Sequence, residues 1–242
     1  MSSLIPRIHE AIRDARRTHR GATMHPSDAP TGAHKEYPRM PRIMLPQPRR
    51  LETPLYDAIG NRRSLRRNGI AQGLSDEVLG TLLGTALGVS TNAPLRHYPS
   101  AGALFPIETY LVGYVRKDAA PGVFHYHPTT HALEHLWDMP ADFKPLDMNT
   151  SSARIEGAFR IFFTAVWERS SAKYGDFAYS HALLEAGHMA QNILLVAEAL
   201  SLSARPLAGF DDAFIADVLD IRAPYEQAVY SVTISPSETI TL

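Results

Sequence analysis

The longest regular pattern of apolar and polar positions in the chain runs from Ala178 to Leu200. Apolar residues recur there in alternating steps of four and three, which is the spacing of one helix face. These positions are Tyr179, Leu183, Ala186, Ala190, Ile193, Ala197 and Leu200. Further apolar residues cover much of the remaining circumference, and a helix that is apolar on several faces is normally buried. The pattern therefore predicts a central helix, with Asp176 as its N-cap.

The opposite stripe of this predicted helix is polar. Its residues are His181, Glu185, His188 and Asn192. The first three lie on one helix face, so they are potential metal ligands. A fourth ligand in register is missing, and so is the adjacent His-Glu pair of a zinc protease helix. We therefore expect the stripe to meet solvent, a neighbouring subunit or a cofactor rather than a metal.

Shorter patterns predict helices and strands on both sides of the central helix. Short helices are expected at 4–19, at 55–61, at 76–87 with Ser75 as N-cap and Gly88 as terminator, and up to Leu219 with Asp211 or Asp212 as N-cap. Strands are expected at 108–115, 123–127, 132–137, 160–167 and 228–234. Residues 202–210 are rich in small side chains and predict a loop. Because hairpins and helices are mixed, the order indicates an α+β layer structure rather than a doubly wound parallel sheet.

The first 54 residues differ in composition from the remainder. Residues 1–50 hold ten Lys or Arg against four Asp or Glu, and prolines recur from Pro26 to Pro54. Proline at this density excludes a long helix. We therefore divide the chain into a basic, proline-rich N-terminal arm at 1–54 and a folded domain at 55–242. The arm either lies extended over a neighbour's surface or is partly disordered. The alternative is an arm that recognises a peptide or another partner.

The overall composition excludes several classes of function. The net charge is −1, which gives no reason to expect nucleic-acid or membrane-surface binding. A 45% share of apolar residues supplies a sizeable core, and there is no cysteine for disulfides or thiolate sites. The central helix is long enough to span a bilayer, but its polar stripe would be stranded in hydrocarbon. With no secretory segment either, we expect a cytoplasmic protein.

Four histidines cluster in the predicted hairpin at 123–137. They are His125, His127, His131 and His135. Metal binding is the alternative to consider, but the spacing matches no standard site and no carboxylate recurs with it. We expect solvated histidines on a strand face, and no metal.

The run from Arg62 to Arg67 contains four arginines and one serine. In an extended segment Arg62, Ser64 and Arg66 project to one side. Two guanidinium groups and a hydroxyl form a suitable receptor for a phosphate dianion, because arginine pairs bidentately with its oxygens. The alternative is a solvated basic surface.

A second candidate site is the segment Pro99-Ser100-Ala101-Gly102. The segment predicts a tight loop in which a planar ligand can approach the backbone closely at Gly102, where no side chain interferes. Taken alone, the same residues are also typical of an ordinary turn.

Four motifs in order resemble the flavin-dependent nitroreductase-like superfamily. They are Arg62-x-Ser64-x-Arg66, Pro99-Ser100-Ala101-Gly102-x-x-x-Pro106-x-Glu108, Gly187-x-x-x-Gln191-Asn192 and Leu207-Ala208-Gly209-Phe210-Asp211. The Pro-Ser-Ala-Gly loop and the pair Lys173-Tyr174 resemble more narrowly the SagB-type branch, whose members make thiazoles and oxazoles in modified peptides. Together the motifs cover most of the chain, from about Tyr37 to Ile234.

The resemblance implies a homodimer of α+β subunits with a central mixed or antiparallel sheet and with FMN at the dimer interface. The cofactor-binding residues implied are Arg62, Arg63, Ser64, Arg66, Pro99, Ser100, Ala101, Gly102, Gln191, Leu207, Ala208 and Gly209. The backbone at Ala208 and Gly209 would lie close to flavin N5. Nitroreductases usually have another cation beyond the last strand, and residues 235–242 contain none. We therefore expect FMN either to rely on the early arginines for its phosphate or to bind more weakly.

The resemblance also implies a reaction, the FMN-dependent oxidation of thiazoline or oxazoline rings to thiazole or oxazole. Lys173 would be the base and Tyr174 its partner, with dioxygen as the expected final electron acceptor. The substrate would be a leader-bearing or carrier-tethered peptide supplied by a separate cyclising enzyme. The alternatives are an NAD(P)H-dependent nitroreductase or quinone reductase, and an FMN-bearing scaffold subunit without catalysis.

Overall fold

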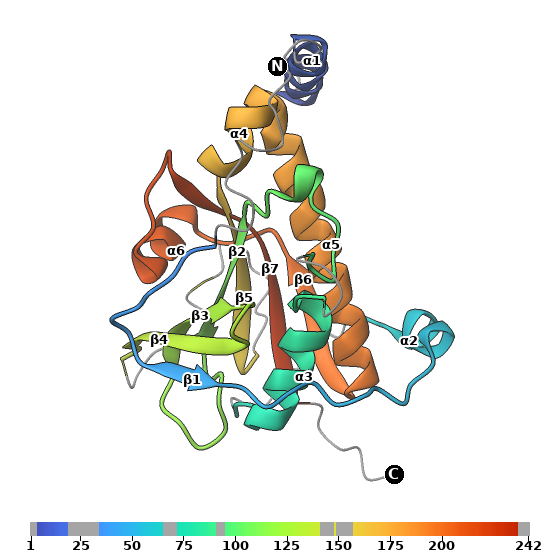
Figure 1. The fold of residues 1–242 in the computed structure, drawn as a ribbon, viewed down its shortest axis with the longest axis vertical. Coiled ribbons are helices and arrows are strands. Elements are labelled where there is room, and N and C mark those ends of the chain that lie inside the picture. The colour runs from blue at the N-terminus through green and yellow to red at the C-terminus, as the bar shows by residue number, and fades with distance from the viewer. Residues whose placement is uncertain are drawn as a thin grey trace.

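The computed structural model describes residues 4–18, 34–64, 72–90, 95–140, 148 and 157–236. Within these ranges the chain folds around one seven-stranded sheet, in which all neighbouring strands are antiparallel (Figure 1). The spatial order is β1-β4-β3-β2-β5-β7-β6. The strands are β1 (Arg42–Met44), β2 (Ile107–Gly113), β3 (Gly122–His127), β4 (Ala132–Asp138), β5 (Phe159–Val166), β6 (Leu202–Leu207) and β7 (Glu226–Pro236).

Helices cover this sheet on both sides. They are α1 (Leu4–Thr18), α2 (Leu55–Asn61), α3 (Asp76–Leu87), α4 (Glu168–Tyr174), α5 (Ala178–Ala199) and α6 (Asp212–Leu219), with 3-10 turns η2 (Ala101–Ala103) and η4 (Gly175–Phe177). Ser75 caps α3 by accepting a hydrogen bond from the Val78 amide, and Asp211 caps α6 through the Phe214 amide. Both side chains satisfy amides that have no partner within the helix.

The two faces of the sheet have separate cores. The larger core joins α3 and α5 to residues such as Leu111, Ile161 and Phe163, which alternate along their strands toward that face. The smaller core joins α6 to the opposite face through Tyr110 and Phe162. The α+β fold with an antiparallel sheet and a long central helix is therefore confirmed.

Two local predictions around the central helix are wrong. Asp176 is not its N-cap, because it lies inside η4 and α5 begins after Phe177 without a side-chain cap. Residues 202–207 are not a loop but the edge strand β6, paired with β7 along its whole length. Pro206 is tolerated there because an edge strand does not need every amide for pairing.

The burial of α5 also differs from its predicted stripe. Tyr179 and Leu183 are exposed, whereas Glu185, assigned to the polar stripe, is only 2% exposed. The helix packs on the sheet and on α3, so its buried face is wide and is rotated relative to the predicted one.

The N-terminal part of the chain contributes to the sheet. Strand β1, within the segment that we defined as the arm, pairs with β4, and Leu45 beside it is buried. Residues 19–33 lie outside the described residues, as do Arg66 and the segment 237–242. Among the described residues no helix combines the length and the apolar character that crossing a membrane requires.

Candidate active site at the Pro99–Phe105 loop

The loop from Pro99 to Phe105 is held in a tight conformation by its own side chain and backbone. The Ser100 hydroxyl accepts a hydrogen bond from the Phe105 amide at 2.9 Å, and the Ala103 amide donates to the Ser100 carbonyl. Gly102 has φ +63°, and Ala103 and Phe105 also have positive φ values. A conformation that is unfavourable for side-chain-bearing residues is often kept where a loop serves a site.

The pair Lys173-Tyr174 lies against this loop at Gly102. A methyl group added at Gly102 would lie 2.7 Å from the Tyr174 hydroxyl and 2.8 Å from Lys173 Nζ, which is too close for real contacts. The two polar groups therefore occupy the space beside a glycine backbone. The structure brings these three predicted residues together, although they are separated by some seventy positions in the sequence.

Lys173 and Tyr174 form the end of α4, a helix that the sequence analysis did not predict. Gly175, with φ +54°, ends it, and the turn η4 leads into α5. The Tyr174 ring contacts His181 at 4.5 Å between centroids, and Phe177 contacts the same imidazole at 4.3 Å. These ring contacts hold the C-terminal end of α4 against the start of α5.

Arg169 connects α4 to the loop. Its guanidinium group donates to the Phe105 carbonyl at 3.2 Å and forms an ion pair with Glu108, the second residue of β2. Arginine presents several donors in a rigid fork, so it can hold two acceptors at once. The contact sets α4 in a fixed position relative to the Pro99–Phe105 loop.

Glu185 is a buried carboxyl group next to this region. Neither of its oxygens makes a hydrogen bond of good geometry with the described residues. Burial raises the pKa of Glu185 to about 7, although nearby Ser100, Arg96 and Arg169 act in the opposite direction. A carboxyl group with a pKa near neutrality can hold or release a proton at physiological pH.

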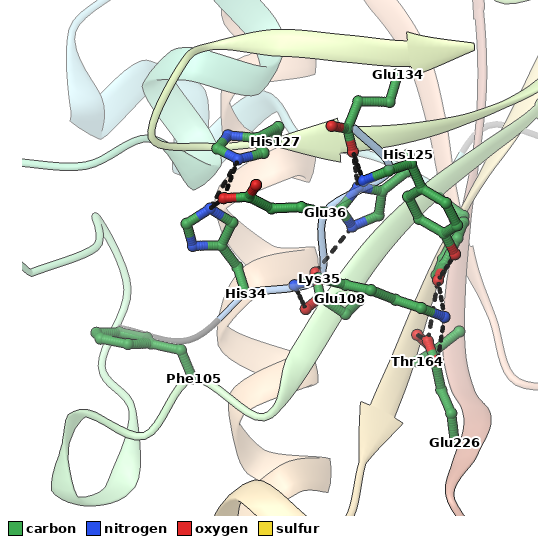
Figure 2. A network of polar contacts seen from close by, with 12 residues as sticks. His34, Lys35, Glu36, Phe105, Glu108, His125, His127, Glu134, Thr164 and Glu226 are labelled. Carbon is green, nitrogen blue, oxygen red and sulfur yellow. Dashed lines mark hydrogen bonds and ion pairs between the residues drawn. The ribbon is translucent and has the colours of Figure 1, made fainter. Parts of the chain in front are cut away.

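Behind the loop, on the α6 side of the sheet, lies a buried row of charges (Figure 2). His125 is placed between two carboxylates, with Nε2 2.9 Å from Glu108 and Nδ1 2.9 Å from Glu134. Burial alone would lower the pKa of His125, but the two carboxylates outweigh it and raise that pKa. Burial would likewise raise the pKa of both glutamates, yet His125 and the arginines Arg169 and Arg42 lower them to about 2.

The same row continues through Lys35, which comes from the N-terminal segment. Lys35 Nζ lies 2.7 Å from Glu226 and 2.9 Å from the Tyr110 hydroxyl, and Thr164 donates to Glu226 at 2.6 Å. The Lys35 amide donates to Glu108 at 2.6 Å. These bonds attach residues 34–37 firmly to the sheet.

The prediction of solvated hairpin histidines is therefore wrong for His125, His127 and His131, whereas the His135 side chain is partly exposed. His125 and His127 are buried, and His131, 9% exposed, bonds Tyr126 and the Pro46 carbonyl. The expected absence of carboxylates also fails, because Glu134 lies in the same hairpin and Glu36 and Glu108 approach from segments outside it.

The predicted phosphate residues lie elsewhere, after α2. Arg62 Nη1 is 3.4 Å from the Ser64 hydroxyl, whereas Arg63 turns back to the Gly60 carbonyl. This alternation agrees with an extended segment that presents Arg62 and Ser64 to one side, while Arg66 lies outside the described residues.

The remaining predicted cofactor residues are more dispersed. Gln191 is exposed on α5, while its neighbour Asn192 donates to the Ala86 and His97 carbonyls. Leu207 ends the edge strand β6, and Ala208 and Gly209 after it are exposed. Pro99 and Ala101 belong to the loop that contains Gly102.

Sequence reasoning missed Glu185 and Arg169 as members of this region. Glu185 was assigned to the polar stripe because helical spacing alone does not reveal which face is covered. Arg169 belongs to an unpredicted helix, and Glu108 appeared only as a motif position. The signal that could have identified Glu185 and Arg169 is a single charged residue inside or beside an apolar segment.

Comparison with known proteins gives the same assignment as the motifs. The model of the nitroreductase family matches residues 59–234. Among curated proteins, the microcin B17-processing protein McbC of Escherichia coli is 32% identical over 132 residues, 52% of this chain and 48% of McbC. The match thus spans about half the length of that relative. A putative nitroreductase, MJ1384 of Methanocaldococcus jannaschii, is 28% identical over 71% of this chain and 86% of its own length.

Solved structures show the same fold. The E. coli microcin synthetase McbBCD complex, with truncated pro-MccB17 bound, contains a chain with a TM-score of 0.63 and 22% identity, covering 98% of both chains. A putative nitroreductase from Desulfovibrio desulfuricans, solved in complex with FMN, has a TM-score of 0.52 and 18% identity over 77% of this chain and 88% of its own. The matched family region and the fold agree, and this chain belongs to the nitroreductase family.

Proposed function

We propose that this protein is an FMN-dependent dehydrogenase that oxidises thiazoline or oxazoline rings of a peptide to thiazole or oxazole. The observation that carries the proposal is the approach of Lys173 and Tyr174 to Gly102. It sets an amine and a phenol directly against a glycine backbone, in the loop whose edge would face the flavin ring. The similarity to McbC supports a peptide-processing role.

Two groups of residues fit a flavin. A cavity of about 530 Å³ adjoins the loop, has Tyr98, Ser100, Ala103 and Phe105 among its lining residues, and is large enough for a ring system of that size. Arg62 and Ser64 lie side by side, as a phosphate receptor requires. FMN, when bound, would supply the acceptor for the hydrogen that leaves the substrate with its electron pair.

The residues of the chain would handle the proton. Oxidising an azoline removes a proton from Cα, which the adjacent imine and carbonyl acidify, and a hydride from Cβ. Lys173 would take the proton as general base, and Tyr174 would orient the ring or relay that proton. Dioxygen, reduced to hydrogen peroxide, is the proposed final acceptor of the two electrons.

We also propose that each site is shared between two chains of a homodimer. Thr53, just before α2, donates to the Ala199 carbonyl at the end of α5, and Leu55 and Ala58 of α2 line a pocket together with Ala199. Lys173 instead precedes the start of α5, at the α4 end of that helix (Figure 1). A helix of 22 residues is about 33 Å long at 1.5 Å per residue. One chain therefore holds the phosphate residues and the Lys-Tyr pair far apart, and a second copy is the economical way to bring them to one cofactor.

The substrate peptide would come from a separate cyclising enzyme, acting on a leader-bearing or carrier-tethered precursor in the cytoplasm. The McbBCD structure with truncated pro-MccB17 bound supports this kind of peptide. A screen of azoline-containing peptides would identify the peptide that this chain oxidises.

The test uses the full chain loaded with FMN and an azoline peptide, with mass spectrometry as the readout. We expect a loss of about 2 Da per ring oxidised. Lys173→Ala should lower the rate by roughly 10²–10⁴-fold, with flavin still bound as judged from the visible spectrum. Glu168→Gln, an exposed change on the same helix, is the matched control.

Azoline oxidation at a near-normal rate in both Lys173→Ala and Tyr174→Phe would contradict the assigned mechanism. Product formation that depends on the presence of the protein but not on its flavin would indicate the scaffold alternative. The relative MJ1384 makes reduction of nitroaromatics by NAD(P)H the second candidate, and assaying that reaction in parallel decides between the two.

A further inference from the structure

A second group of polar side chains lies apart from Lys173 and Tyr174, where the N-terminal segment crosses the end of β3. His34 and Glu36 are two positions apart on an extended segment, so both project to one side. Lys35, between them, extends the other way toward Glu226 (Figure 2). The side chains of His34 and Glu36 meet His127, the last residue of β3.

Three ligand-type atoms converge in this group. His34 Nε2 lies 2.7 Å from His127 Nε2, and Glu36 Oε1 lies 3.5 Å from the former and 3.4 Å from the latter. A tetrahedral zinc ion with bonds of about 2.0–2.1 Å keeps its ligand atoms roughly 3.3 Å apart. Two of the three separations fit directly, and a small rotation of the His34 ring widens the third.

The surroundings also suit a cation. The His127 side chain is 3% exposed and that of His34 is 14% exposed, while Glu36 at 54% leaves one side open for a water molecule.

The outer nitrogen of His127 has a partner that orients the ring. Nδ1 lies 2.9 Å from the Thr130 hydroxyl, so Nδ1–H can donate to it and leave the Nε2 lone pair for a metal. The Thr130 amide, 3.2 Å from the same nitrogen, fits the opposite tautomer, in which His127 donates to His34 without any ion. The geometry thus has two readings that differ in where one proton lies.

We propose that His34, Glu36 and His127 bind one zinc ion, with water as the fourth ligand. Two imidazoles and a carboxylate are a donor set that Zn²⁺ accepts readily, and three protein ligands with one open position form a familiar arrangement. The ion would join the N-terminal segment to the sheet at a point 91 residues away in the chain. The Lys35 amide of the same segment donates a hydrogen bond to Glu108. The ion would therefore also stabilise the position of the buried charged residues behind the Pro99–Phe105 loop.

The test uses the untagged full-length chain, stripped with chelator and then exposed to zinc chloride alone. We expect about one zinc per chain by elemental analysis and a melting temperature that rises with zinc concentration, because an ion that binds the folded state stabilises it. His34→Gln and Glu36→Gln should each weaken zinc binding by more than the roughly 10–100-fold that loss of an outer-shell partner costs. His9→Gln, an exposed histidine on α1, is the matched control and should bind as the wild type does.

The result can also go the other way. A wild-type chain that binds no zinc and shows no zinc-dependent shift would overturn the proposal and leave the hydrogen-bonded tautomer. Zinc that stays bound at full stoichiometry in both variants would overturn it too, because the ion would then lie elsewhere. Near-native circular dichroism of the Gln variants, which remove one ligand each without a large volume change, excludes unfolding as the cause of lost binding.

Discussion

Glu185 holds a carboxyl group inside the larger core, and its ionisation opposes folding. Burial raises its pKa from an ordinary value of 4.5 to about 7. Between these two values the folded chain binds more protons than the unfolded chain, so stability falls as the pH rises through this interval. Well above pH 7 the free-energy cost of burying the ionised Glu185 no longer changes with pH. This residue alone therefore makes the protein relatively more stable in mild acid.

Replacing Glu185 with glutamine removes this titration. We expect Glu185→Gln to gain stability relative to the wild type as the pH rises from about 5 to about 8, by up to about 3 kcal/mol. Urea denaturation at several pH values measures the difference, with both proteins free of flavin. Glu198→Gln on the same helix is the matched control variant. A constant difference for Glu185→Gln would contradict the assignment.

At the residue scale the sequence indicated candidate residues but not their surroundings. A Gly-containing tight loop pointed to Gly102, and the resemblance to the SagB-type branch pointed to Lys173 and Tyr174, which the structure places against that glycine. His125 could not be placed, because its partners Glu108 and Glu134 lie on two other strands. Whether a histidine is solvated or held between two carboxylates depends on strand pairing, which a single sequence does not specify.

At the scale of elements, Arg169 is the link between α4 and the Pro99–Phe105 loop. We expect Arg169→Met to lower kcat for azoline oxidation by roughly 10²-fold, because a displacement of about 1 Å is enough to cost that much. FMN affinity should change little, since the substituted side chain does not belong to the phosphate receptor. Steady-state kinetics and flavin titration separate the two quantities.

Arg169→Lys and Glu168→Gln are the matched variants for this prediction. Lysine keeps the charge opposite Glu108 but not the fork that also reaches the Phe105 carbonyl, so it should give an intermediate rate. Glu168→Gln should behave as the wild type. An Arg169→Met protein with unchanged kcat would show that the contacts of Arg169 with Phe105 and Glu108 do not position the Lys-Tyr pair.

Elements with a strong periodic pattern were predicted correctly, and those defined by their partners were not. The segment α5, the hairpin β3–β4 and the capped helix α3 follow the expected boundaries within one or two residues. Strand β6 was missed because Ser203, Ala204 and Pro206 carry little strand propensity. Pairing with β7 imposes the extended conformation on them.

At the scale of the whole molecule, the sequence indicated the layer architecture but not how the N-terminal segment attaches. Lys35 is bonded to Glu226 and Tyr110, and β1 extends the sheet beside β4. These partners lie far away in the chain, so no local sequence pattern predicts the contacts. From the sequence alone, charged residues in a proline-rich stretch indicate a solvated arm. Only the structure shows that Lys35 neutralises the buried Glu226.

The proposed sharing of each site between two chains makes a prediction that neither chain alone can satisfy. Chains carrying Lys173→Ala lack the base, and chains carrying Arg62→Ala and Arg66→Ala lack the phosphate receptor, so each homodimer should be inactive. When the two are unfolded together and refolded as a mixture, half of the dimers contain one chain of each kind. In such a dimer one site collects all the substitutions, and the other has the native Lys173 and the native arginines. About a quarter of all sites should then regain azoline oxidation, measured against a refolded wild-type control. A mixture with no more activity than its components would mean that each site is built within a single chain, and the flavin phosphate would then need a receptor other than the arginines after α2.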